Sequence, residues 1–293
     1  MKILGESLFE GGLVLPTYSR PNLLEECLKS IYSAENSSQI AKIIVLQLGD
    51  LKVEKLVRRF NDDQTFIIPI KRTNTPPLFN MNYNWWVGAS FGFEILGLPW
   101  LLSLEEESVI KGNAFNFVLE MHEKYESDRK IRGVNLSTKL VDESFRGTYS
   151  LLRYGFMGSG ATILSKDWQK LKRYRVKKRL QHYPWDVFTE AYWKTGFRAT
   201  PNLSMVMNFG WIGGTHTDGI QSENQQMNQI SFQTSDSLND FRLKNLDNGW
   251  INGSRIYDSY EDYIFNIRFA LWLTLDNKVG KPIYKRLVHY FFN

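Results

Sequence analysis

The sequence predicts an α/β fold, in which a largely parallel sheet is flanked by helices. Apolar runs of strand length alternate with amphipathic segments over the first hundred residues. These runs show no polar alternation, which is typical of strands buried on both faces. Helical segments separate them, as the connections of a parallel sheet require. The chain of 293 residues, 43% of them hydrophobic, is long enough to bury a large core.

The alternation begins with an apolar strand over 11–19 that ends in a turn. A helix is expected over 20–34, because Pro21 suits a first helical turn. Helical spacing puts four apolar residues on one face of this helix: Leu24, Cys27, Leu28 and Ile31. The next elements are expected as a strand over 41–48, a helix over 51–60, a strand over 65–70, a helix in the second half of 72–97 and a strand over 98–104.

Ligands of such sheets bind at the carboxyl ends of the strands. The pattern places four groups at this edge: Thr17, Tyr18, Gln47 and the acidic run Glu105–Glu107. Buried charge is unfavourable unless it is paired or binds a cation. Mg²⁺ and Mn²⁺ take oxygen ligands, often one or two carboxylates together with substrate phosphates. The acidic run is therefore a candidate metal site, and a solvated acidic turn is the alternative.

The order of elements is less regular beyond residue 110. We expect a helix over 113–126, a strand over 131–138, a glycine-rich and then β-like segment over 154–165, a helix over 184–196, a strand, turn and strand over 197–210, and a glycine-rich loop over 211–219. One domain over 1–220, followed by a helical extension over 221–293, fits this order best.

Basic residues concentrate in two stretches, 166–181 and 281–293, and the net charge is +5. Such stretches attract phosphates or anionic lipid, and a solvated helix face explains them equally well. The first stretch has few aromatic residues and no known nucleic-acid module around it, so we expect no nucleic-acid partner. The second alternates basic and aromatic residues, as interfacial helices do, although its aromatics can equally pack back on the domain.

Cys27 is the only cysteine, so no disulfide can form within the chain, and a reducing compartment is expected. The first ten residues lack a long apolar run, and the most hydrophobic later stretch, 263–275, contains Arg268 and is too short to span a bilayer. We therefore expect a cytoplasmic protein. Peripheral contact with the inner face of a membrane is a hypothesis that rests on the C-terminal stretch.

Four blocks carry a resemblance, in order, over about residues 12–217. They are VLPTYSRPNLLEECLKSI from Val14, IIVLQLGD from Ile43, LLSLEEESVIKGNAFNFVLE from Leu101, and YPWDVFTEAYWKTGFRATPNLSMVMNFGWIGGTHT from Tyr183. Together they resemble the GT-A glycosyltransferases, in particular N-acetylglucosaminyltransferase I and the family 2-type inverting enzymes. The resemblance implies a Rossmann-like mixed sheet, with nucleotide-sugar binding over about 1–110 and acceptor binding over about 111–220.

The resemblance also implies an activity. Such enzymes are inverting and metal-dependent, and they move a sugar from a nucleotide donor, here expected to be a UDP-sugar, to a hydroxyl of a glycan or lipid-linked glycan. Glu107 matches the position that ligates Mn²⁺ or Mg²⁺, and Glu106 the position near the ribose. The residues at positions that border the nucleotide are Pro16, Thr17, Tyr18, Arg20, Gln47 and Glu105. Asp186 matches the catalytic base.

This chain departs from the family pattern at two positions. Glu107 stands where Asp is usual, so its arm is longer. Leu48 stands where many members place the Asp that binds uracil, which leaves the base open, although Asp50 is a candidate substitute.

At Asp186 a carboxylate can take the proton of an acceptor hydroxyl as the new bond forms. Trp185 beside it would desolvate the carboxylate and raise its pKa. The alternative is that Asp186 caps the helix that follows Pro184.

Weaker candidates for contact with the donor or acceptor sugar are Gly158, Gly160, Trp185, Trp211 and His216. The glycines allow close backbone approach, a Trp ring can stack on a sugar, and an imidazole can bind a metal. A plain turn with an exposed His explains the last of these equally well.

Two other functions compete with the enzyme. A non-catalytic nucleotide- or carbohydrate-binding module on the same fold is suggested by Leu48 and by the unusual glutamate run. A nucleotidyltransferase would need a glycine-rich phosphate loop after the first strand, and the segment PTYSRP contains no glycine.

Overall fold

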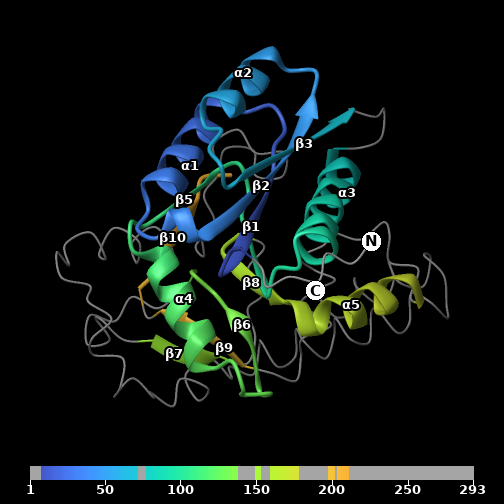
Figure 1. Cartoon of the computed structure of the whole chain (residues 1–293). Helices are drawn as coiled ribbons and strands as arrows, with labels where there is room; N and C mark the ends of the chain where they lie inside the picture. The colour runs from blue at the N-terminus through green and yellow to red at the C-terminus, as the bar shows by residue number, and fades with distance from the viewer. Residues whose placement is uncertain are drawn as a thin grey trace, which may run out of the picture.

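A five-stranded sheet in the order β3-β2-β1-β4-β8 forms the centre of the computed structural model (Figure 1). Its strands are β1 (Gly11–Pro16), β2 (Ile40–Leu48), β3 (Thr65–Lys71), β4 (Trp100–Ser103) and β8 (Ala161–Leu164). The first four run parallel and β8 is antiparallel to β4, so the sheet is mixed. The structure describes residues 8–71, 77–137, 149–152, 159–177, 197–201 and 203–210.

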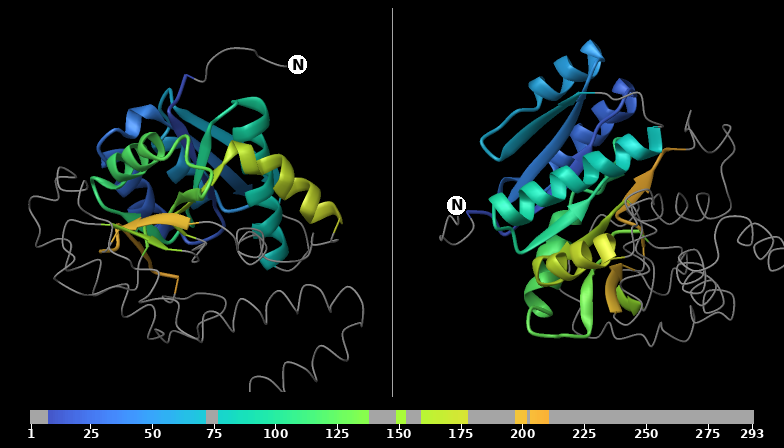
Figure 2. Two further views of the ribbon diagram at one scale, coloured as in Figure 1. Left: turned by 90° about the horizontal axis from the view of Figure 1, so that it is seen from below. Right: turned by 90° about the vertical axis from the view of Figure 1, so that its right-hand side faces the viewer.

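Helices cover both faces of this sheet (Figures 1 and 2). The helices of the first face are α1 (Pro21–Ser33), α2 (Leu51–Arg59) and α4 (Ala114–Lys124), and those of the second are α3 (Pro77–Ser90) and α5 (Ser165–Lys177). Strand residues alternate between the two layers: Leu13 and Leu15 pack in the first, and Val14 packs in the second. Both faces of β1 are therefore buried, which explains its unbroken apolar sequence.

Smaller elements complete the described chain. They are the 3₁₀ turn η1 (Ser37–Gln39), the π-helical turn η2 (Phe91–Ile95), and the strands β5 (Ser108–Ile110), β6 (Ile131–Val134), β7 (Tyr149–Leu152), β9 (Phe197–Pro201) and β10 (Val206–Asn208). Strand β10 pairs antiparallel with β5, and β9 lies between β6 and β7 in a three-stranded sheet. The first pairing matters for function, because it brings a distant segment of the chain beside the acidic run.

The connection between strands changes direction at β1. From β1 the chain moves outward on one side through β2 to β3, and then returns to form β4 on the other side of β1. Open α/β sheets bind ligands at such a switch point, in the crevice outside the carboxyl ends of the strands. The fold therefore assigns the crevice between the ends of β1 and β4 as the place to look for a site.

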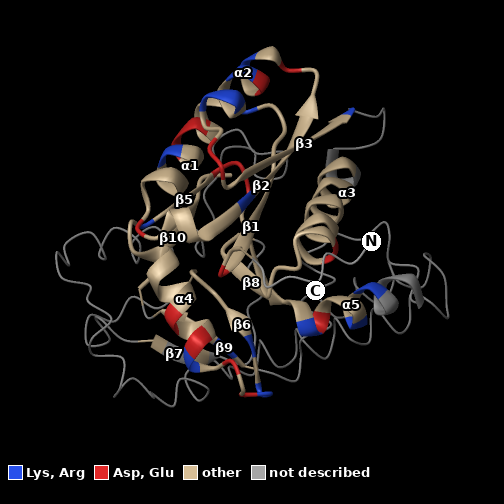
Figure 3. Cartoon of the chain, in the orientation of Figure 1, with Lys and Arg blue, Asp and Glu red and all other residues tan. Residues whose placement is uncertain are grey.

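The predicted fold class, a mixed α/β sheet flanked by helices, is confirmed. All four residues expected on the buried face of α1 are buried. The glutamates do lie just past the end of a strand, β4. The basic stretch from residue 166 begins inside α5, whose lysines are visible in Figure 3. The expected helix over 184–196, the loop over 211–219 and the extension over 221–293 lie outside the described residues.

The sequence pattern did not predict the short strands β5 and β7 or the π-helical turn η2. Strands β5 and β7 contain only three and four residues, too few for a period to be read. In the described part of the segment over 154–165, the expected β-like stretch forms β8 at Ala161–Leu164, and α5 begins at Ser165. Within the described part of the chain, no helix is long and apolar enough to cross a lipid bilayer.

A side chain at Gly11 should disrupt the packing of β1 against β4. A Cβ atom there would lie 2.1 Å from the ring of Trp100, which is itself buried. We expect Gly11→Ala to lower the free energy of unfolding by about 1–3 kcal/mol, because the rigid indole must shift inside a packed core. Urea unfolding measures this. Gly112→Ala is the matched control, since no atom lies within 4 Å of its Cβ position, and equal effects at the two glycines would contradict the packing argument.

Candidate functional site

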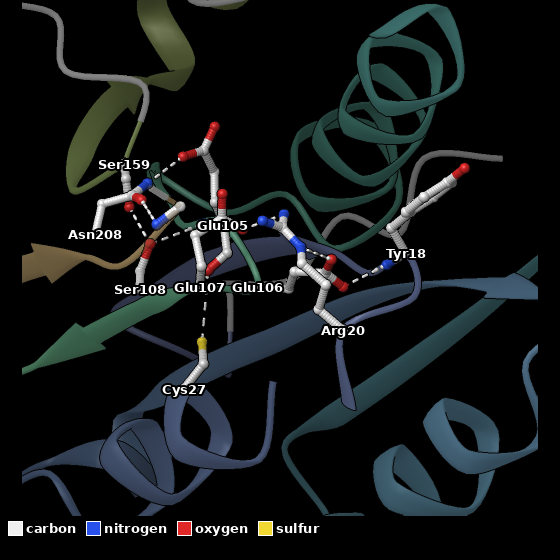
Figure 4. Close-up of polar contacts among 10 residues, drawn as sticks. Tyr18, Arg20, Cys27, Glu105, Glu106, Glu107, Ser108, Ser159 and Asn208 are labelled. Carbon is white, nitrogen blue, oxygen red and sulfur yellow. Dashed lines mark hydrogen bonds and ion pairs between the residues drawn. The ribbon is translucent and has the colours of Figure 1, made fainter. Parts of the chain in front are cut away.

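The acidic rim lies at the switch point of the sheet, where the segment after β1 meets the segment after β4 (Figure 4). We use this name for Tyr18, Arg20 and Glu105–Glu107. Leu104 N donates a hydrogen bond to Val14 O (3.1 Å), and Thr17 N donates one to Val45 O (3.0 Å). The residues that follow β1 and β4 are therefore held at neighbouring positions by main-chain bonds of the sheet.

Glu106 links the two segments. One of its carboxylate oxygens accepts from Tyr18 N (2.5 Å) and the other from Arg20 Nε (2.9 Å). Its side chain is 3% exposed, so the charge has lost nearly all contact with water. A buried carboxylate is stable only when paired and hydrogen-bonded, and these donors provide that. Glu106 thus joins the loop after β1 to the loop after β4. The resemblance placed Glu106 near a ribose, and both of its oxygens already have partners within the chain.

Glu107 shares the same guanidinium. Arg20 Nη2 donates to Glu107 Oε2 at 2.6 Å, and the Glu107 side chain is 11% exposed. Burial raises the pKa of Glu107 and the neighbouring Glu106 charge raises it further, although Arg20 opposes both effects. The pKa of Arg20 is raised by the two carboxylates, against the opposing effect of its own burial. A second cation near Glu107 would lower its pKa and relieve the repulsion from Glu106.

Glu105 points away from Arg20 and toward β10 (Figure 4). Its Oε2 accepts a hydrogen bond from Asn208 Nδ2, and its main-chain oxygen accepts a weak one from Cys27 Sγ at 3.6 Å. Burial raises the pKa of the Cys27 thiol, and the two nearby carboxylates Glu106 and Glu107 raise it further. Cys27 is therefore a packed residue of α1 that stays protonated. The three consecutive glutamates do not converge on one point.

Asn208 is a residue of the site that the sequence analysis did not single out. Strand β10 pairs with β5 so that Asn208 faces Ser108, directly after the acidic run. Its Oδ1 accepts from Gly210 N at 2.6 Å while its Nδ2 holds Glu105. Phe209 N also donates to Glu107 O (2.9 Å). The segment MNFG belongs to the fourth block of the resemblance, which indicated a role for this region. Only the pairing of β10 with β5 shows that the segment reaches the acidic rim.

Gly210 lies close to two oxygen atoms of the site, and we call the space that a side chain at this position would enter the recess. A Cβ atom there would lie 2.7 Å from Glu107 Oε1 and 2.7 Å from Asn208 Oδ1. Two oxygen atoms, from Glu107 and Asn208, thus border the recess, and the side chain of any residue other than glycine at position 210 would enter it. Hard divalent cations prefer carboxylate and amide oxygens.

The recess suits a divalent cation that has few protein ligands and takes its remaining ligands from phosphate and water. Within the described ranges, no group of three or more Asp, Glu, His or Cys side chains is placed to hold a metal. Mg²⁺ commonly binds through one or two carboxylates, so Glu107 and Asn208 fit this kind of site.

Three further predicted residues lie at the ends of neighbouring strands. Thr17 is buried, and its hydroxyl donates to Val45 O at 3.3 Å. Gln47 lies near the end of β2 and is 3% exposed. Pro16 is the last residue of β1. The strand ends therefore bring Thr17, Gln47 and the acidic rim to one edge of the sheet, as the sequence pattern predicted.

The remaining predicted residues divide into two groups. Gly160 is described: it has φ +93°, and a Cβ there would lie 2.6 Å from Val206 Cγ1, so its glycine character serves the packing of β8 against β10. The others, Gly158, Trp185, Asp186, Trp211 and His216, lie outside the described residues. Trp85, Trp86 and Trp100 are buried in the core and offer no platform to a sugar.

Comparison with known proteins gives structural similarity alone. No protein-family model matches the chain, and no curated protein sequence matches it. Among solved structures, TarS residues 1–349 from S. aureus is 12% identical over 92% of this chain and 81% of that chain, with a TM-score of 0.49. The complex of the same fragment with UDP-GlcNAc is 11% identical over the same shares, with a TM-score of 0.47.

The mannosyltransferase PcManGT from Pyrobaculum calidifontis, in complex with GDP-Man and Mn²⁺, is 11% identical over 93% of this chain and 88% of that chain, with a TM-score of 0.43. These three TM-scores are below 0.5, so the functional proposal below rests on the site of this chain.

Arg20 should stabilise the fold as well as the site. We expect Arg20→Ala to lower the free energy of unfolding by about 3 kcal/mol, because it leaves Glu106 buried without its charged partner. Lys29→Ala is the control: Lys29 also contacts two carboxylates, Glu25 and Glu26, but on the exposed surface, where ion pairs contribute little. Urea unfolding of both variants measures the difference. An Arg20→Ala protein as stable as the Lys29→Ala protein would show that the buried pair does not hold the two loops together.

Proposed function

We propose that this chain is a glycosyltransferase that uses a nucleotide-sugar donor. In this proposal it moves a sugar, hexosyl or N-acetylhexosaminyl, to a hydroxyl of a glycan or lipid-linked glycan, with inversion at the anomeric carbon. The proposal combines the sequence resemblance with one structural observation. That observation is the meeting of the Arg20 guanidinium and the Glu107 carboxylate at the switch point of a nucleotide-binding type of sheet.

The chemistry of the rim suits a nucleoside diphosphate. A diphosphate leaving group needs positive charge near its oxygens, and a bidentate guanidinium is well shaped for phosphate. Arg20 lies at the carboxyl end of β1, where Glu106 and Glu107 already balance its charge, so a bound cation would supply most of the positive charge that the diphosphate needs. Glu107 and Asn208 would hold a Mn²⁺ or Mg²⁺ ion, which supplies Lewis-acid stabilisation of the departing diphosphate. Glu105 and Glu106 orient Asn208, Tyr18 and Arg20 through the hydrogen bonds described above.

Asp186 is proposed as the base that takes the proton of the acceptor hydroxyl. The acceptor would bind to the 111–220 segment, and Gly158, Trp185, Trp211 and His216 are proposed contacts of the acceptor or the donor sugar. Inversion follows when one carboxylate activates the acceptor and attack comes from the side opposite the leaving group. A cytoplasmic location and contact of the C-terminal stretch with an anionic membrane surface complete the proposal and suit a lipid-linked acceptor.

Glu107 should be required for metal-dependent binding of the donor. We expect Glu107→Gln to abolish the rise in melting temperature that Mn²⁺ adds to a nucleotide sugar, because the amide removes the charge that holds the ion. Differential scanning fluorimetry with a panel of nucleotide sugars, with and without Mn²⁺, measures this and names the donor. Glu26→Gln, on the exposed side of α1, is the control. An undiminished Mn²⁺ effect in Glu107→Gln would place the ion elsewhere.

Asp186 should be required for transfer and not for donor binding. We expect Asp186→Asn to keep the melting-temperature shift with donor and Mn²⁺ and to lose about 10²–10⁴-fold in turnover, the contribution typical of a general base. Release of nucleoside diphosphate, followed by chromatography, measures turnover. Normal turnover in this variant would remove Asp186 as the base. A wild-type protein that binds donor and never turns it over, even by slow hydrolysis, would favour the non-catalytic binding module.

A further inference from the structure

Among the described residues, Gln47 is a buried amide that finds no hydrogen-bond partner. Both of its side-chain polar atoms, Oε1 and Nε2, are buried and unpaired, and the residue keeps 3% of its surface exposed. A buried polar group without a partner is unfavourable to the fold. The unpaired Gln47 amide therefore needs an explanation. A bound ligand that supplies its missing hydrogen-bond partners is one explanation.

The side chain of Gln47 lies between the sheet and α3. Along β2, Ile43 and Val45 point to the layer that contains α3, and by alternation so does Gln47. A Cβ atom at Gly92 would contact Ile43, and one at Gly88 would contact Val45. One helical turn toward the N-terminus of α3 therefore corresponds to two residues toward the carboxyl end of β2. The next turn brings Asn84, which is 2% exposed, to the level of Gln47. Gln47 therefore lies on the face of the sheet that α3 covers, near the carboxyl end of β2.

The position of Gln47 relative to the acidic rim matches the length of a nucleotide. Strand β2 lies beside β1 on the side away from β4. Two strand spacings, about 10 Å, therefore separate the end of β2 from the end of β4, where Glu107 lies. A nucleoside diphosphate whose phosphates occupy the rim would extend its base along the ends of the strands toward β2.

We propose that Gln47 recognises the hydrogen-bonding edge of the donor nucleobase, an inference that rests on the proposed function above. A carboxamide offers one donor and one acceptor side by side, and a nucleobase edge offers the complementary pair. Bidentate pairing would satisfy both unpaired atoms at once. The two neighbouring candidates are unsuited: Leu48 has no polar group, and the Asp50 carboxylate caps α2 by accepting from Lys52 N and Val53 N.

The first test compares Gln47→Met with wild type. Methionine has nearly the shape of glutamine and needs no hydrogen bond, so the free protein should melt higher, by roughly 2–8 °C. Affinity for the preferred nucleoside diphosphate, chosen from UDP, GDP, ADP and CDP by calorimetry with Mn²⁺, should fall about ten- to a hundredfold. Affinity for inorganic pyrophosphate with Mn²⁺ should stay unchanged, because the rim is untouched. Gln39→Met, in the turn η1 directly before the start of β2, is the control.

The second test compares Gln47→Glu with wild type. A carboxylate accepts two hydrogen bonds and donates none. Guanine presents two donors side by side, whereas uracil presents one donor beside an acceptor that the carboxylate would repel. The ratio of the Kd for UDP to the Kd for GDP should therefore rise at least about tenfold relative to wild type. An unchanged ratio would overturn the role of Gln47 in reading the base.

The outcomes separate this inference from the function on which it rests. A Gln47→Met protein that keeps wild-type affinity for the preferred nucleotide, or that melts below wild type, overturns the inference and leaves the proposed function standing. A wild-type protein that binds no nucleoside diphosphate more tightly than pyrophosphate overturns both. Higher melting temperature, weaker nucleotide binding and unchanged pyrophosphate binding together support it.

Discussion

The ion pair between Arg20 and Glu106 is the interaction on which the site depends. The two residues are 86 positions apart in sequence, and their contact joins the loops that follow the two central strands. Because the Glu106 carboxylate is buried, its attraction to Arg20 is weakly screened and its geometry is held by Tyr18 N as well. The position of Glu107, one residue further, follows from this link. A site built on main-chain bonds of the sheet and one buried pair needs little reorganisation when a ligand arrives.

Residues from the second half of the chain complete the site that begins with the loops after β1 and β4. Strand β10 adds to β5 and so presents Asn208 and Gly210 to the glutamates from the opposite side. The recess near Glu107 is thus bordered by residues more than a hundred positions apart. Residue 210 must remain small because its Cβ would occupy the space between two oxygen atoms. The sequence resemblance implies that donor contacts come before residue 110 and acceptor contacts after it. Asn208 and Gly210 are exceptions, because they lie beside the proposed donor site.

Sequence reasoning reached the central sheet and its edge because their signals are local. Unbroken apolar runs identify strands buried on both faces, and the edge at which their carboxyl ends meet follows from the parallel order. It did not reach Asn208, because a three-residue strand has no readable period and its partner depends on tertiary pairing. Nor did it separate the roles of the three glutamates. Consecutive residues look equivalent in sequence, but these three lie in a turn closed by the bond from Ser108 N to Glu105 O, which sends Glu105 toward β10 and Glu106 toward Arg20.

The balance of charge at the rim connects stability to binding. Glu106 and Glu107 pair with one guanidinium, and Glu105 is held nearby by Asn208, so these four charged side chains carry an excess of two negative charges when all are ionised. Burial is the main cause of the raised pKa of Glu107, and the negative charge of Glu106 adds to it. A divalent cation carries the charge that would balance the four side chains. Gln47 shows the same relation in neutral form, with two polar atoms that the fold alone does not satisfy. The excess negative charge and the unpaired amide both lower the stability of the free protein. One ligand would relieve both, because its phosphate-bound cation would lie at β4 and its base at β2.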